Sequence, residues 1–244
     1  MTTADARVDE RQDHHVHSTF SDDAVSTLEE NVAAASARGL RVLRLVDHVR
    51  VSTTWVPDLL AAVAALDVPD GLEVRTGVEA KILDASGRLD LPPGLGTHAG
   101  VDRVLVADHQ FPGADGPVSP RVVRERVRTP QDAADAVDVV VGATVAAMHQ
   151  VDRAQLAHLF SLLPKIGASE DDVTDEHLRA LAAAAAATGT LVEVNEKWAC
   201  PGPRTVRALL AAGVELVVST DSHDSRDVGR YSRVSEILQA ADPR

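Results

Sequence analysis

The chain has 244 residues, of which 45% are hydrophobic, enough for one sizeable core and within the range of an α/β barrel. Its 24 basic and 37 acidic side chains leave a formal net charge of −13, which disfavours nucleic acid and anionic membrane surfaces as partners. The single cysteine, Cys200, excludes an internal disulfide, a thiolate zinc site and an iron–sulfur cluster, and this scarcity is typical of a cytoplasmic protein. The longest apolar stretch is interrupted by Asp138, so no membrane span is predicted.

Short runs rich in valine, leucine and isoleucine alternate with alanine-rich runs of helical length, as in repeated βα units around a parallel sheet. Strands are predicted at 13–17, 41–46, 73–79, 103–108, 154–158, 190–194 and 215–219. Helices are predicted at 26–38, 56–66, 130–150, 174–188, 203–212 and 231–241. This number of strands favours a barrel over an open sheet, and we expect a single domain over residues 1–244.

Two connections in this pattern carry more specific signals. Ser26 and Glu29 have the spacing of a capping box, and Gly39 can end the helix that they would begin. The connection at 110–129 is rich in proline and glycine, and a loop of this length in a compact domain is usually functional. We expect it to cover the active site.

The strongest chemical signal is the segment DHHVHSTFSD at 13–22. Residues two apart on a strand point to the same face, so His15 and His17 can converge on one metal ion. Asp22, just beyond the strand, can fold back and add an oxygen ligand. A single histidine is more often a hydrogen-bonded structural residue than a ligand, so the prediction depends on repetition of the pattern.

The pattern repeats after most of the predicted strands. The C-terminal ends of parallel barrel strands form one face, so residues at these ends meet in space. The candidate metal ligands at these positions are His15, His17, Asp22, His48, Glu79, His109, His158, Asp221 and His223. Imidazole and carboxylate donors without thiolate favour zinc, manganese or iron, and this set is too large for one ion. A carboxylate such as Glu79 can bridge two ions, and clustered cations can activate water for attack on phosphorus.

At these motifs the sequence resembles the PHP family, named for its polymerase and histidinol phosphatase members. The resemblance rests on His-x-His followed by Ser-Asp, then Asp-His, Gly-x-Glu, a strand ending in His, Ala-His and Asp-x-His, and it runs from Asp13 to about Gly229. It implies an α/β, distorted TIM-like (β/α)7 barrel with two or three divalent metal ions, closest to the stand-alone phosphatases and the polymerase-associated domains. The sequence departs from the family pattern at Val46, Asp23 and Leu159, and none of these departures removes a ligand.

Several assignments stay open at this point. His149 competes with His158, which we prefer because it ends a predicted strand, whereas His149 ends a predicted helix. Glu79 and Asp221 are the candidates for positioning a metal-bound hydroxide, and Arg226 is the candidate for holding the phosphate. Glu193 and Asn195 are equally compatible with supporting the ligands and with contacting substrate. Arg50, Lys165 and Lys197 are weaker substrate candidates, and no role is assigned to His14, His98 and His177.

These residues predict a phosphoesterase that hydrolyses a small phosphorylated substrate, with histidinol phosphate one candidate by family analogy. One alternative is a metal-dependent hydrolase of an amide or cyclic C–N bond, because an activated hydroxide also attacks carbonyl carbon. Another is a non-catalytic PHP module, which the full set of candidate ligands disfavours. Neither nucleic acid nor a membrane is an expected partner, and the sequence does not indicate an oligomeric state.

Overall fold

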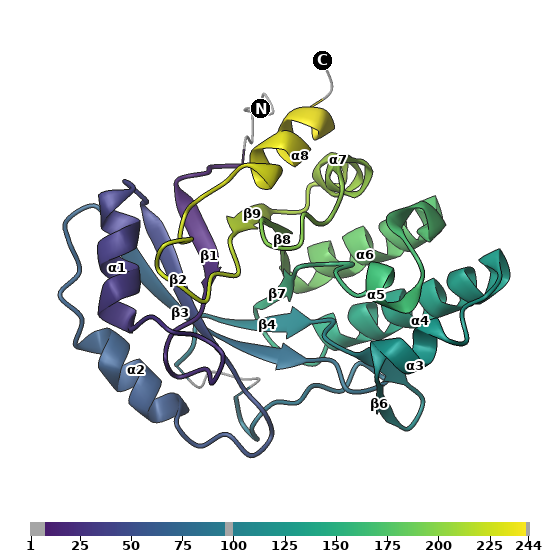
Figure 1. Cartoon of the computed structure of the whole chain (residues 1–244), viewed down its shortest axis with the longest axis horizontal. Helices are drawn as coiled ribbons and strands as arrows, with labels where there is room; N and C mark the ends of the chain where they lie inside the picture. The colour runs from purple at the N-terminus through teal and green to yellow at the C-terminus, as the bar shows by residue number, and fades with distance from the viewer. Residues whose placement is uncertain (1–7, 96–99, 243–244) are drawn as a thin grey trace.

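The fold is described from a computed structural model, which covers residues 8–95 and 100–242; His98 and the two ends of the expected domain lie outside these ranges. Seven parallel strands form one sheet in the order β1-β2-β3-β4-β7-β8-β9 (Figure 1). They are β1 (Gln12–Val16), β2 (Val42–His48), β3 (Glu73–Lys81), β4 (Arg103–Ala107), β7 (Ala154–Ala157), β8 (Leu191–Asn195) and β9 (Leu216–Ser219). Each predicted strand is present within two residues of its expected bounds, and the α/β fold class is confirmed.

The sheet closes into a barrel between its first and last strands. Val16 bridges Ser222 in parallel, and the amide of His17 donates to the carbonyl of Ser222 at 2.8 Å. The buried carboxylate of Asp13 reinforces this seam, because it accepts hydrogen bonds from the Thr220 amide at 3.0 Å, the Thr220 hydroxyl at 2.6 Å and the Gly229 amide at 2.9 Å. Closure therefore brings the histidines after β1 beside the residues that follow β9.

Helices cover the outside of the barrel (Figure 1). The longer ones are α1 (Leu28–Ala37), α2 (Val56–Ala64), α4 (Pro130–Met148), α6 (Asp175–Thr188), α7 (Pro203–Ala211) and α8 (Arg233–Ala241). The main apolar core lies between these helices and the sheet. In the described part of the chain, a separate small apolar cluster of Val46, Leu105, Ala107 and Ala157 lies on the strands.

The capping box of α1 lies one residue later than predicted, at Thr27 and Glu30. The predicted cap, Ser26, is buried, and its hydroxyl instead accepts a hydrogen bond from the amide of Ser225 at 2.8 Å. The prediction of Ser26 and Glu29 was wrong because a contact distant in sequence occupies the serine.

The connection at 110–129 is structured. It contains the hairpin of β5 (Phe111–Gly113) and β6 (Gly116–Val118), followed by α3 (Pro120–Arg124). Arg124 donates to the carbonyl of Pro164, which lies in the short helix α5 (Leu163–Ile166), at 3.1 Å. Within this connection, only Gln110 lines the pocket described below. The segment therefore packs beside the barrel, contrary to the expectation that it covers the active site.

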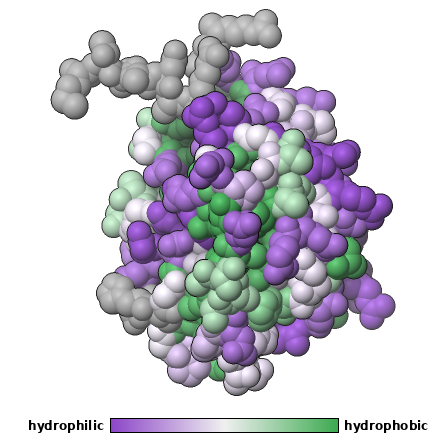
Figure 2. All heavy atoms as spheres, turned by 90° about the vertical axis from the view of Figure 1, so that its left-hand side faces the viewer, coloured by the Kyte–Doolittle hydropathy of each residue, from purple (hydrophilic) through white to green (hydrophobic). Residues whose placement is uncertain are grey.

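The surface on the side of α1 and α2 mixes hydrophilic and apolar residues, with a more apolar band near the middle of the view (Figure 2). Among the described residues, no helix is both long and apolar enough to cross a lipid bilayer. The longest helix, α4, has charged residues along its sequence.

Candidate metal centre

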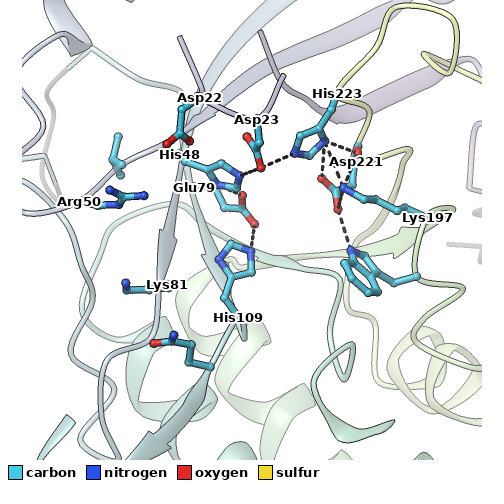
Figure 3. A pocket seen from close by; sticks show the side chains of 13 residues that line it. Asp22, Asp23, His48, Arg50, Glu79, Lys81, His109, Lys197, Asp221 and His223 are labelled. Carbon is cyan, nitrogen blue, oxygen red and sulfur yellow. Dashed lines mark hydrogen bonds and ion pairs between the residues drawn. The ribbon is translucent and has the colours of Figure 1, made fainter. Parts of the chain in front are cut away.

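A pocket of about 390 Å³ opens at the C-terminal ends of the strands. The barrel brings the predicted ligands other than Asp22 into contact with one another around and beneath this pocket. Figure 3 shows the members of this set that line the pocket, together with Asp22: His48, Glu79, His109, Asp221 and His223. The members of the whole set lie on or just after six strands. His15 is in β1 and His17 directly follows it, while His48, Glu79, His109, His158, and the pair Asp221 and His223 lie at or beyond the ends of β2, β3, β4, β7 and β9. The parallel arrangement of the strands is what gathers these distant residues at one face.

Glu79 lies at the centre of the cluster, and its side chain is almost fully buried. His48 Nδ1 lies 2.7 Å from one carboxylate oxygen, while His109 Nε2 and His158 Nε2 each lie 3.1 Å from the other. Burial alone would raise the pKa of Glu79, but His109 and His15 hold it well below its usual value. The charged form of the carboxylate is therefore favoured, and each of its oxygens lies beside imidazole nitrogens that can share a metal ion with it.

A second group surrounds the end of β1. His15 Nε2 and His17 Nε2 lie 3.0 Å apart, and Asp221 Oδ1 lies 3.3 Å from His17 Nε2. Burial opposes protonation of His15, but Glu193 and Glu79 raise its pKa well above the usual value, whereas burial lowers the pKa of His17 to about 3. Two imidazole nitrogens that face one another beside carboxylates form an arrangement that one cation can satisfy.

A third group includes a residue that the sequence analysis did not select. Asp23 Oδ2 lies 3.4 Å from His48 Nε2 and 3.3 Å from His223 Nε2. Asp22 lines the same pocket, but no ion pair or hydrogen bond joins its side chain to the cluster within residues 8–95 and 100–242. The structure thus places the exposed carboxylate of Asp23, rather than that of the predicted Asp22, against the histidines at the edge of the pocket.

The donor set fits divalent metal ions. The buried Oε2 atom of Glu79 has no hydrogen bond of acceptable geometry, although His48, His15 and His17 each place a nitrogen within 3.5 Å of it. An unpaired buried carboxylate oxygen is costly unless a charge compensates it. The ligand atoms also form three groups with the close spacing of metal sites: His15, His17 and Asp221; His48, Glu79 and His109; and His17, His48 and His223.

Buried carboxylates contact the histidines at Nδ1, the ring nitrogen opposite the Nε2 atom that points into the cluster. Glu193 lies 3.2 Å from His15 Nδ1, and Asp108 lies 3.1 Å from His158 Nδ1. Asp47 accepts from the hydroxyl of Ser21 at 2.7 Å, and the same hydroxyl lies 3.3 Å from His17 Nδ1. Such carboxylate–histidine pairs fix the ring orientation and make the ligating nitrogen more basic.

The supporting carboxylates were mostly missed by sequence reasoning. Glu193 was left open between two roles, and the structure puts it behind His15. Asp47 and Asp108 each precede a predicted ligand, so the repeated Asp-His dipeptide at two strand ends was a usable signal. Burial raises the pKa of Asp47 to about 6, whereas hydrogen bonds from Ser18 and Ser21 act in the opposite direction.

Two of the candidate ligands have unusual backbone conformations. His158 has a φ of 32° and Asp221 a φ of 52°, both in the left-handed region that non-glycine residues rarely adopt. His158 directly follows β7, and Asp221 lies two residues beyond the end of β9. Strain of this kind persists where the surrounding structure enforces it, often at functional sites.

The other histidines that the structure describes, His14, His149 and His177, lie away from the cluster. His149 caps the C-terminus of α4 and is exposed, which favours His158 as the ligand. His14 lies against Gln12, and His177 lies in the first turn of α6, 2.8 Å from Asp138. Neither His14 nor His177 lines the pocket.

The predicted phosphate-binding arginine is not at the pocket. The guanidinium of Arg226 pairs with Asp224, is 84% exposed and is absent from the residues that line the cavity. Arg50, Lys81 and Lys197 line it instead, together with Trp198. The structure does not bring Arg226 to the cavity, because the arginine folds onto a carboxylate two residues earlier in its own turn.

The model of the PHP domain family matches residues 13–197. This match covers more than half of the chain, and the chain therefore belongs to the PHP domain family. It has the same fold as the histidinol phosphate phosphatase of Lactococcus lactis, solved with zinc, L-histidinol and phosphate, at a TM-score of 0.70 and 15% identity over 95% of this chain and 92% of the other. The candidate histidinol phosphatase of Listeria monocytogenes has a TM-score of 0.60 and 14% identity, covering 90% and 97%. A comparison with curated proteins gave no significant match.

Proposed function

We propose that this chain is a metal-dependent phosphoesterase that hydrolyses small phosphate monoesters. The observation that carries the proposal is the buried Glu79 carboxylate, which is surrounded by imidazole nitrogens at the base of an open pocket and has one oxygen without a well-aligned hydrogen bond. Membership of the PHP domain family supports the same chemistry. The single cysteine, which is buried and free, supports a cytoplasmic location.

His15, His17 and Asp221 would hold one metal ion, and His109 and His158 would hold another, with Glu79 between them. His48, His223 and Asp23 would hold a third. Zinc, manganese or iron bound at these positions would neutralise phosphate charge and supply a hydroxide nucleophile near neutral pH.

The protein's own side chains orient the reactants. Asp221 is held in place by the indole N–H of Trp198, which donates to its Oδ2 at 2.8 Å. Its Oδ1 faces the histidines, so Asp221 and Glu79 would position the attacking water. Lys197 Nζ lies 3.3 Å from Asp221 and can donate to a phosphate oxygen in the pocket. Fixed donors and charges of this kind stabilise a phosphoryl transition state without reorganising during the reaction.

The test is elemental analysis of the purified protein combined with turnover of p-nitrophenyl phosphate, before and after chelation and with each metal restored. We expect bound metal and turnover that chelation abolishes. His17→Ala should abolish turnover, whereas His149→Ala should retain it because His149 is outside the cluster. Turnover that survives chelation, or full activity of His17→Ala, would reject the proposed mechanism.

A panel of phosphate esters and amides then identifies the bond and the substrate. Histidinol phosphate belongs in this panel because L-histidinol and phosphate occupy the Lactococcus lactis structure. Hydrolysis of amides without hydrolysis of esters would indicate a C–N hydrolase. Bound metal without hydrolysis of any member would favour a non-catalytic module.

A further inference from the structure

A second pocket adjoins the metal centre and contains a cation that the proposed mechanism does not use. This pocket has a volume of about 430 Å³ and is lined by apolar groups of Phe160, Pro164 and Trp198, together with Lys165. Trp198 also lines the pocket over the candidate ligands, so the two pockets meet at this side chain. A small substrate with its phosphate at the metals can extend past Trp198 into the second pocket.

The side chain of Trp198 separates the two pockets and is held in place by hydrogen bonds. Its backbone amide donates to Asn195 Oδ1 at 3.0 Å, and its indole N–H donates to Asp221 Oδ2 at 2.8 Å. Its ring is in edge contact with His158, with centroids 6.1 Å apart. The position of Trp198 is therefore fixed to two candidate metal ligands.

Lys165 packs against the ring of Trp198. Its ammonium is 3.7 Å from the centroid of the Trp198 ring, and the flanking Leu163 and Ile166 are fully buried, which restricts the turn that carries it. Lys165 is half-buried, and within residues 8–95 and 100–242 no carboxylate lies within ion-pair distance of it. An indole face attracts a cation but does not neutralise it.

Each of the other cations near the metal centre is either paired with a carboxylate or exposed to solvent. Lys197 pairs with Asp221 at 3.3 Å, and Lys81 pairs with Asp90 at 3.3 Å. Arg50 has no such pair among the described residues, but it is exposed and therefore hydrated. Figure 3 shows Arg50 and Lys81 across the pocket from Lys197. Lys165 is thus the half-buried cation that lacks a counter-charge on the Trp198 side, as far as the described chain extends.

The acidic residues of the second pocket do not supply this counter-charge. Both oxygens of Glu170 are occupied, one by the amide of Gly202 and the other by the hydroxyl of Thr205, each at 2.7 Å. Asp171 is exposed to solvent. An anion that enters the pocket therefore meets Lys165 as the available charged donor.

We propose that Lys165 binds a second anionic group on the alcohol portion of the substrate, so that the preferred substrates are phosphate monoesters bearing a carboxylate or a further phosphate. This inference rests on the proposed phosphoesterase function and narrows its substrate class. The scissile phosphate occupies the metal pocket, the alcohol portion passes Trp198, and the second anion reaches the ammonium of Lys165.

The kinetic test compares phosphoglycolate, which carries a carboxylate, with ethyl phosphate, which has similar size and no second charge, using the metal-loaded protein. We expect kcat/KM to favour phosphoglycolate by about tenfold, as one charge-assisted hydrogen bond allows. Ethylene glycol bisphosphate tests a phosphate as the second anion, and phosphoethanolamine tests an amine. Preference for phosphoethanolamine, or equal rates for phosphoglycolate and ethyl phosphate, would overturn the inference.

Variants assign the effect to Lys165. Lys165→Met should bring the preference for phosphoglycolate close to unity, and Lys165→Arg should retain it. Arg50→Met is the matched control, since it removes a cation from the opposite side of the metal pocket. Loss of the preference in Arg50→Met, with retention in Lys165→Met, would place the second anion elsewhere and contradict the proposal.

A binding measurement separates this inference from the catalytic proposal. Trp55 and Trp198 are the two tryptophans of the sequence, so Trp55→Phe leaves Trp198 as a fluorescent reporter beside Lys165. Phosphonopropanoate should then bind about tenfold more tightly than propylphosphonate, and Lys165→Met should remove the difference. Equal binding would reject the second-anion site alone. Failure of both phosphonates to bind would reject the phosphate site as well.

Discussion

At the scale of single residues, the turn after β1 distinguishes two adjacent aspartates. Asp23 contacts His48 and His223, whereas Asp22 makes no polar contact with the cluster as far as the described residues show. We predict that Asp23→Asn lowers the metal content of the purified protein, because an amide is a weaker ligand than a carboxylate, and that Asp22→Asn leaves it unchanged. Elemental analysis of both variants checks this, and the opposite pattern would restore Asp22 as the ligand.

The carboxylate behind His15 gives a second prediction at this scale. Glu193 is fully buried, lies 3.2 Å from His15 Nδ1 and also accepts from Gln155 at 3.0 Å. Glu193→Gln should weaken metal binding by roughly 10- to 100-fold, the usual effect of losing such support. Titration of the metal-free protein with zinc measures the change. Asp138→Asn, which removes the carboxylate beside the distant His177, is the control and should bind as the parent does.

The sequence identified most of the candidate ligands because they recur at strand ends, and that regularity is visible without a structure. It selected Asp22 and not Asp23, although both lie in the turn after β1, where Ser18 and Ser21 donate hydrogen bonds to Asp47 of the neighbouring strand β2. It also did not anticipate the pairing of Arg226 with Asp224, which directs the guanidinium away from the pocket lining. Contacts of this kind depend on geometry that residue spacing does not contain.

At the scale of secondary structure, the strands were predictable because their apolar runs are short and bounded, and the helices because their lengths and breakers are clear. Errors concentrate where distant segments meet. The cap of α1 shifted by one residue because Ser26 bonds to Ser225, and the connection at 110–129 forms a hairpin and a helix against α5. Propensity describes a segment in isolation, and neither partner is close in sequence.

The packing of a turn against α4 gives a prediction on stability. Gly87 has a φ of 79°, and a Cβ at this position would lie 2.4 Å from the backbone nitrogen of Ala147. Gly71 has a φ of 87°, and a Cβ added there would meet no described atom within 4 Å. Both alanine variants incur the left-handed strain of roughly 1–2 kcal/mol, but Gly87→Ala must also displace a helix. Chemical denaturation should therefore show a larger loss for Gly87→Ala, and equal losses would contradict the contact.

The seam between β1 and β9 gives a prediction on pH. Burial raises the pKa of Asp13 from 3.8 to about 6, although hydrogen bonds from Thr220 and Gly229 oppose the change. The folded state therefore binds this proton more tightly than the unfolded chain, so the contribution to stability is full below pH 3.8 and is lost as the pH rises through 6.

Asp13→Asn lacks this titration, which makes it a suitable reference for the wild type. The stability of the wild type relative to Asp13→Asn should increase as the pH falls from about 7 to about 4, by up to about 3 kcal/mol. Urea denaturation of both proteins in the presence of a chelator measures the difference. A difference independent of pH would show that Asp13 keeps an ordinary pKa in the seam.

At the scale of the whole molecule, the net charge of −13 contrasts with the proposed anionic substrate. Much of the negative charge that matters locally is at the metal centre, where Glu79, Asp221, Asp23 and Glu193 gather among the histidines. Bound cations would reverse the sign of this region and attract phosphate without changing the rest of the surface. The same cations would also connect most of the barrel, because the candidate ligands come from strands β1, β2, β3, β4, β7 and β9.

Metal removal should therefore affect the stability of the entire barrel. Ions that bind the folded state and not the unfolded chain stabilise it by about 4 kcal/mol when present at 1,000 times their dissociation constant. We expect chelation to lower the melting temperature, and restored zinc or manganese to raise it with increasing concentration.

His17→Ala, which removes a donor shared by two of the ligand groups, should show a smaller response, whereas His149→Ala should respond like the parent. Differential scanning calorimetry across a metal titration measures these shifts. A melting temperature independent of metal in the parent would mean that the cluster is stable without cations, and that the surrounding imidazoles are sufficient to compensate the buried Glu79 carboxylate.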